Sequence, residues 1–345
     1  MTNTMLRREF LFSLAGICCA PPQRAFALPV RSAPGKAITV RGPVPAQDLG
    51  MTLMHEHVMV DFVGAEQASR NRYDPDEVFR TVLPYLSQIR SLGCRTLVEC
   101  TPAYLGRDPV LLTRLSGASG LQIITNTGFY GAAGGKYLPR EAHEESAEKL
   151  AERWVEEFEK GMEGTEVRPG FIKTGVNTGP LSVIDAKLAR AAALAHKSTG
   201  LTIASHTGDG AAAMEQLDIL AAGGVAPEAF IWVHAQNAKD GEFHAKAAAR
   251  GAWIEFEGST ESAVEARAAQ VKALADRGFL HKTLISLDAG WYRVGEPDGG
   301  AFRSYDFFFT AFVPALRRVG ITEAQLRQLT VDNPREALTV SRRLL

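Results

Sequence analysis

The chain has 345 residues, of which 46% are hydrophobic and 22% are charged, a composition typical of a globular protein with one large or two smaller domains. Lysine and arginine (38) nearly balance aspartate and glutamate (39), and no long basic or acidic run is present. This pattern argues against nucleic acid or an anionic membrane as the partner and favours a small-molecule substrate.

The first 27 residues have the features of a cleaved signal peptide. Arg7 and Arg8 precede an apolar stretch, and the small residues Ala25 and Ala27 suit cleavage after Ala27. The stretch is too short for an ordinary transmembrane helix, and paired arginines are typical of the twin-arginine route, which exports folded proteins. We therefore predict a periplasmic or secreted protein that does not contact the membrane after cleavage, with one domain over residues 28–345. A disordered or anchoring N-terminus is the alternative.

Cleavage would remove Cys18 and Cys19, and it would shift the formal charge from −1 to −3 because three arginines and one glutamate are lost. The remaining Cys94 and Cys100 flank a predicted strand and would lie about 20 Å apart in an extended chain. That separation is too large for a disulfide. We therefore expect no disulfide framework, as for a protein that folds in a reducing cytoplasm before export.

From residue 51 onward, short apolar β-rich runs alternate with stretches of helical period, which indicates βα units around a parallel sheet. Strands are predicted at Thr52–His55, Thr96–Cys100, Gln122–Thr127, Phe171–Thr174, Thr202–His206, Phe230–His234, Ala252–Phe256 and Thr283–Asp288. Helices are predicted near 75–91, 108–117, 141–160, 182–198, 211–222, 240–250 and 262–277, and after 305. This spacing matches an α/β fold of the TIM (β/α)8 barrel type, although periodicity alone does not exclude a doubly wound open sheet.

Segments outside this repeat are expected to cover the barrel. Residues 31–50 contain proline and glycine and are predicted to form a short extended cap. The two longest loops are predicted at 129–140 and 289–304, and both would lie over the barrel mouth.

Metal-ligand residue types stand at the carboxyl ends of several predicted strands. His55 and His57 are two residues apart on one strand, so both rings point to the same face and can chelate one ion. His206, His234 and Asp288 each end a later strand. Each of them alone is more often a structural residue, but the carboxyl ends of all barrel strands meet at one face, so we expect the set to lie together.

Lys173 lies inside an apolar predicted strand, where an inward-facing ammonium without a partner would be costly. An outward-facing surface lysine is the alternative. A buried lysine with a depressed pKa can react with carbon dioxide to give a carbamate, whose oxygens can bridge two metals. The other histidines lie on helices or loops and are interpreted as solvated, namely His143, His196, His244 and His281.

Motifs across nearly all of the predicted mature region resemble those of the phosphotriesterase family of the amidohydrolase superfamily. The matching segments are Met51–His57 (MTLMHEH), Gly170–Lys173 (GFIK), Ser205–Thr207 (SHT), Val233–His234 (VH), Ile285–Asp288 (ISLD) and Asn333–Leu338 (NPREAL). Arg107, in the Gly-Arg-Asp sequence at 106–108, also matches a family motif and is interpreted as structural.

The resemblance implies a barrel of the metal-dependent hydrolase type with two divalent ions, zinc as the first choice and manganese, cobalt or iron as alternatives. One ion would be held by His55, His57 and Asp288, the other by His206 and His234, and a carbamylated Lys173 would bridge them together with a hydroxide. The hydroxide would attack an ester, lactone or phosphotriester centre that the second metal polarises, and Asp288 would take up the released proton. A homodimer is usual among similar proteins.

The substrate pocket is less well defined by these motifs. Tyr130 matches a tyrosine that lactone-hydrolysing relatives place beside the metals, so it is predicted to be catalytic and to favour a lactone or ester. Trp291 and Tyr292 follow Asp288 directly and are expected to wall the leaving-group side of the pocket. The same centre could instead hydrolyse amides or cyclic imides, and a non-catalytic periplasmic binding protein on a barrel is a further alternative.

Asn237 and Gly258 depart from the family pattern, because the best-studied relatives have an acidic and a basic residue there that relay protons or hold substrate. Glu255 and Glu257 stand on the neighbouring strand. They could line the pocket or bind a basic group of the substrate, and ion pairing to a nearby arginine or lysine is the preferred interpretation.

Overall fold

The computed structural model describes Met1, residues 35–258 and residues 260–345. Residues from 35 onward belong to one compact unit. The predicted signal peptide lies outside the described residues except for Met1 and stays a prediction, which N-terminal sequencing of the exported protein would check. Within the described part of the chain, no helix combines the length and apolar character needed to cross a membrane.

The strands form one hairpin and two parallel sheets. They are β1 (Lys36–Thr39), β2 (Gly42–Pro45), β3 (Thr52–Val60), β4 (Thr96–Glu99), β5 (Gln122–Ile124), β6 (Asn126–Thr127), β7 (Phe171–Val176), β8 (Ile203–Thr207), β9 (Phe230–Val233), β10 (Trp253–Glu257), β11 (Thr283–Ser286) and β12 (Ala289–Arg293). The sheet orders are β11-β10-β9-β8-β7-β6 and β12-β3-β4-β5, and β1 pairs antiparallel with β2. The prediction of an α/β fold with parallel strands is confirmed.

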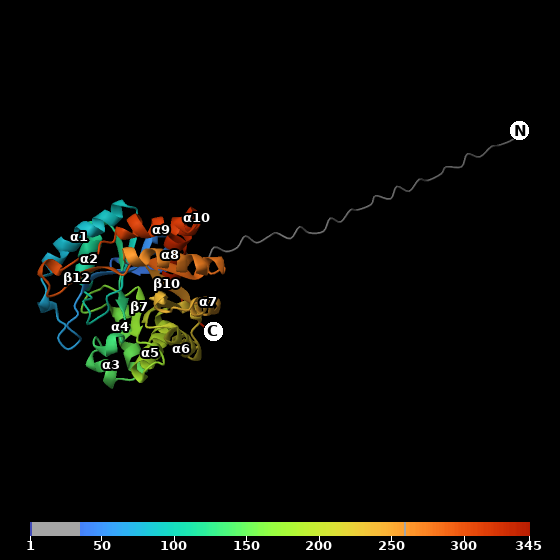
Figure 1. Cartoon of the computed structure of the whole chain (residues 1–345). Coiled ribbons are helices and arrows are strands. Elements are labelled where there is room, and N and C mark those ends of the chain that lie inside the picture. Colours follow the sequence, from blue (N-terminus) through green and yellow to red (C-terminus); the bar gives the residue numbers. More distant parts are fainter. Residues whose placement is uncertain (2–34, 259) are drawn as a thin grey trace. The chain divides into compact units, whose positions relative to one another are not determined.

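Helices connect the strands and lie outside them (Figure 1). The α-helices are α1 (Pro75–Ser91), α2 (Pro109–Ser119), α3 (Arg140–Glu144), α4 (Ala147–Lys160), α5 (Val183–Thr199), α6 (Gly210–Ala222), α7 (Gly241–Arg250), α8 (Glu261–Asp276), α9 (Val313–Arg318), α10 (Glu323–Arg327) and α11 (Asn333–Leu338). Two π-helical segments, η8 (Phe308–Phe312) and η9 (Gln328–Asp332), adjoin α9 and α11. Short 3₁₀ segments are η1 (Ala46–Leu49), η2 (Arg70–Arg72), η3 (Ala133–Gly135), η4 (Pro227–Ala229), η5 (Ala235–Asn237), η6 (Leu280–Lys282) and η7 (Pro297–Gly299).

The helices begin where the sequence supplies a cap. Asp74 accepts a hydrogen bond from the Asp76 backbone N–H, and Asp108 accepts from the backbone N–H groups at the start of α2. A proline follows each of these aspartates at the first helical position, where its missing N–H costs no intrahelical bond. These local signals explain why the predicted boundaries of α1 and α2 agree closely with the structure.

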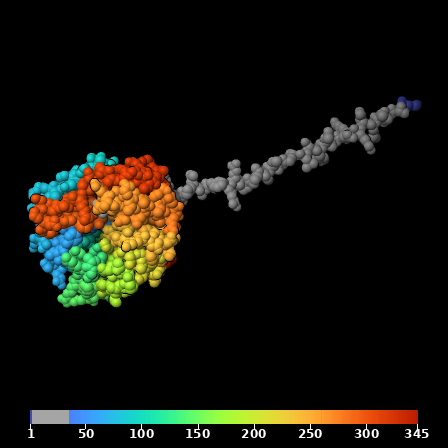
Figure 2. Space-filling view, viewed as in Figure 1, coloured from blue at the N-terminus to red at the C-terminus, as the bar shows by residue number. Residues whose placement is uncertain are grey.

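The first and last parts of the compact unit adjoin. Figures 1 and 2 show α1, in cyan, beside the red C-terminal helices, and the Gln88 amide on α1 donates a 2.7 Å hydrogen bond to Asp306. The two parallel sheets also adjoin, since only Thr125 separates β5 from β6. At their other edges, the His55 N–H donates to the Ser286 hydroxyl oxygen (2.8 Å) and the Asp288 N–H donates to the His55 carbonyl (2.9 Å).

Two buried apolar clusters lie on the two sides of the strands. The inner cluster takes a side chain from each of the eight predicted strands, through Met54, Val98, Ile124, Phe171, Ala204, Ile231, Trp253 and Leu284. The outer cluster joins the strands to the helices and includes Ile254 and Phe256 of β10. Because strand side chains alternate between faces, Glu255 and Glu257 point to the same inner side as Trp253.

The region after β11 differs from the prediction of a long loop over 289–304. The backbone of Asp288 adopts a left-handed conformation (φ 57°), which turns the chain so that Ala289–Arg293 forms β12 and pairs in parallel with β3. Residues 36–45 form the β1–β2 hairpin within the predicted extended cap.

Candidate metal centre

His55 and His57 lie buried on β3 with ring centroids 5.2 Å apart. The His57 Nδ1 lies 2.8 Å from the Thr101 hydroxyl, which itself donates to the Met59 carbonyl. The Thr101 oxygen therefore accepts from the His57 Nδ1–H, and the Nε2 lone pair is left free for a metal. Thr101 was not among the predicted site residues, although its position directly after the second predicted strand is a signal for it.

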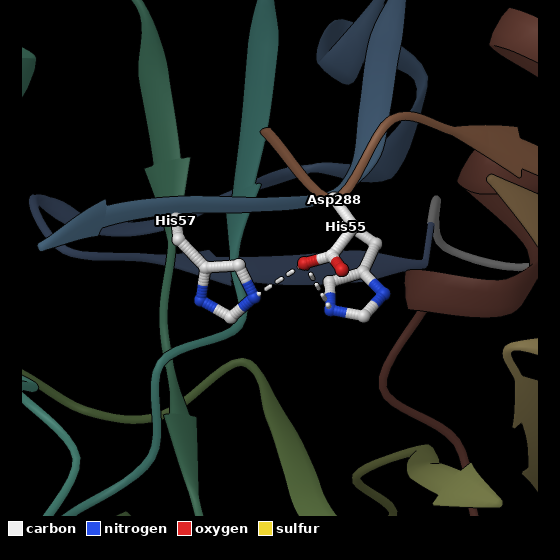
Figure 3. Close-up of side chains that lie close together, drawn as sticks. All are labelled: His55, His57 and Asp288. Atoms are coloured by element: carbon white, nitrogen blue, oxygen red, sulfur yellow. Dashed lines mark ion pairs between the residues drawn. The ribbon is translucent and has the colours of Figure 1, made fainter. Parts of the chain in front are cut away.

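Asp288 faces both rings, as Figure 3 shows. Its Oδ1 lies 3.0 Å from the His57 Nε2 and 3.8 Å from the His55 Nε2. Burial alone would raise the pKa of Asp288, but the close contact with the His57 ring and the charges of the nearby histidines lower it to about 2. The carboxylate is therefore ionised at neutral pH, and the three side chains form one group that could hold a metal ion.

His234 and His206 extend this group. Their ring centroids lie 4.3 Å apart, and those of His55 and His234 lie 5.0 Å apart, so the rings form a continuous row. Burial lowers the pKa of His55, His57 and His206, which keeps these rings in the neutral form that binds metals. Burial also acts on His234, but the Glu257 carboxylate outweighs it and raises the pKa of that ring.

Lys173 on β7 is buried, with 2% of its surface exposed, and its Nζ has no hydrogen-bond partner among the described residues. Its charge is one of the causes that lower the pKa of both His55 and His206. The alternative of an outward-facing surface lysine is therefore wrong, and Lys173 is buried as predicted. A buried amine without a partner is costly, and a carbamate on Nζ bound to metal would remove that cost, so the residue fits the predicted centre.

Glu257 lies between two of the histidines. Its Oε1 is 3.2 Å from the His55 Nδ1, and its Oε2 is 3.1 Å from the His234 Nδ1. The hydrogen bond with Glu257 favours Nδ1–H on His55 and leaves its Nε2 lone pair for a metal, while the Glu257 charge lies beside the His234 ring. His55, His234 and Glu257 also form a second group with metal-ligand geometry.

The preferred interpretation of Glu255 and Glu257 as partners of arginine or lysine is wrong. Neither carboxylate has an ion pair with such a residue in the described ranges, because both point inward from β10. Burial, followed by the charge of Glu257, raises the pKa of Glu255 well above its usual range, and Glu255 Oε1 has no hydrogen-bond partner in the described structure.

Replacing Glu257 with glutamine is expected to weaken binding of both proposed ions by about 10- to 100-fold, because His55 and His234 each lose an outer carboxylate partner. Glutamine has the same shape but lacks the charge and the second acceptor oxygen. Metal titration of the purified protein measures the change. Glu265→Gln on α8, where the carboxylate pairs with the exposed Arg318, is the control and should bind metal normally. Unchanged affinity in Glu257→Gln would contradict the role.

The three aromatic residues predicted to line the pocket do not all lie beside the histidine row. The Tyr130 hydroxyl lies 3.1 Å from the His206 Nδ1, and the Trp291 ring lies 5.8 Å from the His57 ring in an edge arrangement. Tyr292 points the other way, because its hydroxyl donates a 2.6 Å hydrogen bond to Glu77 on α1. The prediction that Tyr292 lines the pocket is wrong, since neighbouring side chains on β12 face opposite sides.

Gly258 follows β10 directly, and Phe312 of η8 occupies the space beside it. A Cβ at this position would lie 2.9 Å from the Phe312 ring. A larger residue at this position would therefore require the Phe312 ring to move. Asn237 lies on η5, and none of the predicted ligand side chains hydrogen-bonds to it.

Gly258→Ala is expected to lower the free energy of unfolding by about 1–3 kcal/mol, because the added methyl would overpack against Phe312. Urea unfolding measures the change. Gly117→Ala on α2 is the matched control, because a Cβ there meets nothing within 4 Å. That variant should be neutral or slightly more stable, since alanine favours helix. A Gly258→Ala protein as stable as the parent would show that Phe312 shifts without cost.

The interpretation of the other histidines as solvated holds for two of them. His143 and His281 are exposed. His196 is buried, with Nδ1 2.8 Å from the Leu201 carbonyl, and His244 is buried with Nε2 2.7 Å from the Ala235 carbonyl. These two rings are structural because backbone groups satisfy them.

Arg107 is buried away from the histidine row. Its guanidinium donates to Glu157 (2.7 Å), to Glu163 and to the Asn126 carbonyl. It borders a cavity of about 490 Å³ that α4 and the segments after β3 and β4 line together. These contacts agree with a structural role for Arg107.

The fold and the site together define an α/β protein with buried histidine and carboxylate groups that could bind metal. The phosphotriesterase family model matches residues 35–338. The chain belongs to the phosphotriesterase family.

Relatives with assigned names cover most of the chain. A phosphotriesterase homology protein of Escherichia coli K12 is 29% identical over 289 residues, which is 83% of this chain and 96% of the relative. An aryldialkylphosphatase of Saccharolobus solfataricus is 26% identical over 304 residues (85% and 96%). A phospho-furanose lactonase of Mycoplasmopsis synoviae is 24% identical over 326 residues (88% and 91%).

Proposed function

We propose that this chain is a metal-dependent hydrolase of ester bonds that uses two divalent ions and acts on a carboxylic ester, a lactone or a phosphotriester. The family membership and the ester-hydrolase names of two relatives support this class of reaction. The two metal ions would be held by the predicted ligands His55, His57, Lys173, His206, His234 and Asp288.

The observation that carries the proposal is the row of four histidine rings beside one ionised aspartate and one buried, unpartnered lysine. A single structural histidine needs only one backbone partner, as His196 and His244 illustrate. Four adjoining histidine rings beside a shared carboxylate are instead typical of a metal centre.

The proposed scaffold is a closed (β/α)8 barrel. Neighbouring strands follow chain order from β3 to β5 and from β6 to β11, and the last strand, β12, pairs with the first strand of its sheet, β3. This order lacks the reversal that marks a doubly wound sheet. The inner apolar cluster draws on all eight predicted strands, as a filled barrel interior requires. The hydrogen bonds between β3 and the end of β11 support closure at one junction, and the short step from β5 to β6 supports it at the other.

Two divalent ions bound here would polarise the substrate oxygen and make a water molecule acidic enough to lose a proton near neutral pH. Asp288 stays ionised at that pH and can accept the proton at Oδ1. Thr101 and Glu257 hold the His57 and His55 rings in one tautomer throughout. The Tyr130 hydroxyl lies at the His206 end of the row, where it can donate a hydrogen bond to a substrate oxygen.

Metal analysis combined with a substrate panel tests the proposal. The purified protein is loaded with zinc, manganese, cobalt or iron and offered aryl esters, lactones, phosphotriesters, amides and cyclic imides. Two ions per chain and turnover of an ester class are expected, and His55→Asn should lose both. If the protein hydrolyses amides or imides but no esters, it is an amide or imide hydrolase instead. If it binds a ligand without hydrolysing any substrate of the panel, a binding protein is favoured.

A further inference from the structure

Four aromatic rings form a continuous edge along the histidine row, which we call the aromatic rim: Tyr130, Tyr137, Phe62 and Trp291. Successive ring centroids lie 6.0, 6.3 and 5.4 Å apart. One end of the rim contacts His206 through Tyr130, and the other end contacts His57 through Trp291. A substrate held at the histidine row would therefore lie against an apolar, aromatic surface.

Arg303 adds a positive charge at the Trp291 end of the rim. Its guanidinium carbon lies 4.0 Å from the centre of the Trp291 ring, and its Nη1 donates a long hydrogen bond (3.5 Å) to the Asp288 carbonyl. Within the described ranges, no carboxylate lies within 4.0 Å of this guanidinium. Arg293, on the same segment, does face a carboxylate, with Glu296 at 3.5 Å. Arg303 is thus a partly exposed cation whose N–H donors are largely unused.

The backbone fixes the position of Arg303. Its N–H and C=O exchange two 2.8 Å hydrogen bonds with Gly290 on β12, two residues after Asp288. Trp291, the ring beneath it, has a left-handed backbone (φ 74°), a conformation that is costly for a bulky residue. Such strain persists where the surrounding structure holds it and often marks a functional site. In this structure the left-handed backbone of Trp291 places the indole ring between His57 and Arg303.

A second cation on the rim is already engaged. The Lys136 ammonium lies 5.6 Å from the Tyr137 ring and donates a 2.6 Å hydrogen bond to the Phe62 carbonyl. Of these two cations, Arg303 is the one that offers a guanidinium fork for an oxyanion such as a carboxylate, sulfonate or phosphate.

We infer that the substrate is an anionic ester or lactone, with an apolar or aromatic body that packs on the rim and an oxyanion that Arg303 binds. This inference rests on the proposed hydrolase function and specifies its substrate class. Arg303 acts as a specificity-determining residue, because loss of a charge-assisted hydrogen bond disfavours only the substrate that makes it.

The test compares two aryl esters that differ only in one group, 4-carboxyphenyl acetate and its neutral carboxamide, in the metal-loaded protein and in Arg303→Met. Methionine keeps an apolar side chain over Trp291 and removes the charge. The parent protein is expected to prefer the carboxylate by about tenfold to a hundredfold in kcat/KM, mainly through KM. Arg303→Met should lose this preference and keep its rate on the carboxamide, whereas Arg293→Met should keep both.

Equal rates on the two esters in the parent protein, or a preference that survives in Arg303→Met, would overturn the inference and leave ester hydrolysis intact. If neither ester is hydrolysed, the proposed function fails for aryl esters. The role of Arg303 is then tested separately, by measuring the binding of an anionic ligand. Calorimetry with benzoate and benzamide should then show a preference for benzoate in the parent protein that Arg303→Met lacks. Benzoate binding that Arg303→Met leaves unchanged would place the anion elsewhere.

Discussion

Asp288→Asn is expected to lower kcat by about a thousandfold or more while the fold persists, because asparagine cannot take up the proton released when water attacks. Asparagine has nearly the same shape and tolerates the left-handed backbone that Asp288 adopts (φ 57°). The Asp288 N–H to His55 carbonyl hydrogen bond is also unaffected by the change. The measurement is kcat on the best ester of the panel, with circular dichroism and metal content recorded on the same samples.

Asp298→Asn provides the matched control for this substitution. Asp298 also has a left-handed backbone (φ 52°) and lies on the segment that follows β12, but it is exposed and forms no contact with the histidine row. Its variant should keep the parent rate. An Asp288→Asn protein that retains a tenth or more of the parent kcat would show that the proton goes to another group.

Lys173→Met is expected to abolish binding of at least one ion and to lower kcat by three orders of magnitude or more, on the order of what a lost metal contributes. Methionine fills much of the buried space of Lys173, so the variant removes the amine and leaves little cavity. Metal content per chain and the mass of the metal-loaded protein, with and without bicarbonate, measure the effect. The parent protein should gain the mass of one carbon dioxide at Lys173 when metal and bicarbonate are both present.

The surface residue Lys160 supplies the control, because its ammonium pairs with Glu156 on the exposed side of α4. Lys160→Met should keep two ions and the full rate. If Lys173→Met also kept them, the bridging role of Lys173 would be wrong, and the buried amine would need another explanation.

Much of the fold could be predicted because its signals are local. Apolar runs of β character and helical periods located the strands from β3 to β11, with β5 and β6 predicted as one, but not β1, β2 or β12 as strands. Histidine or aspartate at a strand end is the signal for most of the predicted ligands. The capped starts of α1 and α2 are equally local, since Asp74 and Asp108 act on the next few residues. These features depend on neighbours in sequence, which a single chain displays directly.

What could not be predicted depends on contacts between distant segments. Glu257 meets His55, 202 residues away in sequence, and nothing near Glu257 indicates that its partners are histidines. His196 appears solvated by its place on a helix but is covered by Arg343 near the C-terminus. The strand β12 forms only because Asp288 turns the chain, and a left-handed aspartate leaves no mark in the sequence.

The position of Glu257 between His55 and His234 has a consequence for how such a centre can change. One carboxylate lies against a ligand of each proposed ion, with Oε1 near His55 and Oε2 near His234. A substitution of Glu257 that changes the affinity of one metal site therefore changes the affinity of the other as well. Adaptation of the two sites to different metals would have to proceed through ligands that they do not share, His57 for one and His206 for the other.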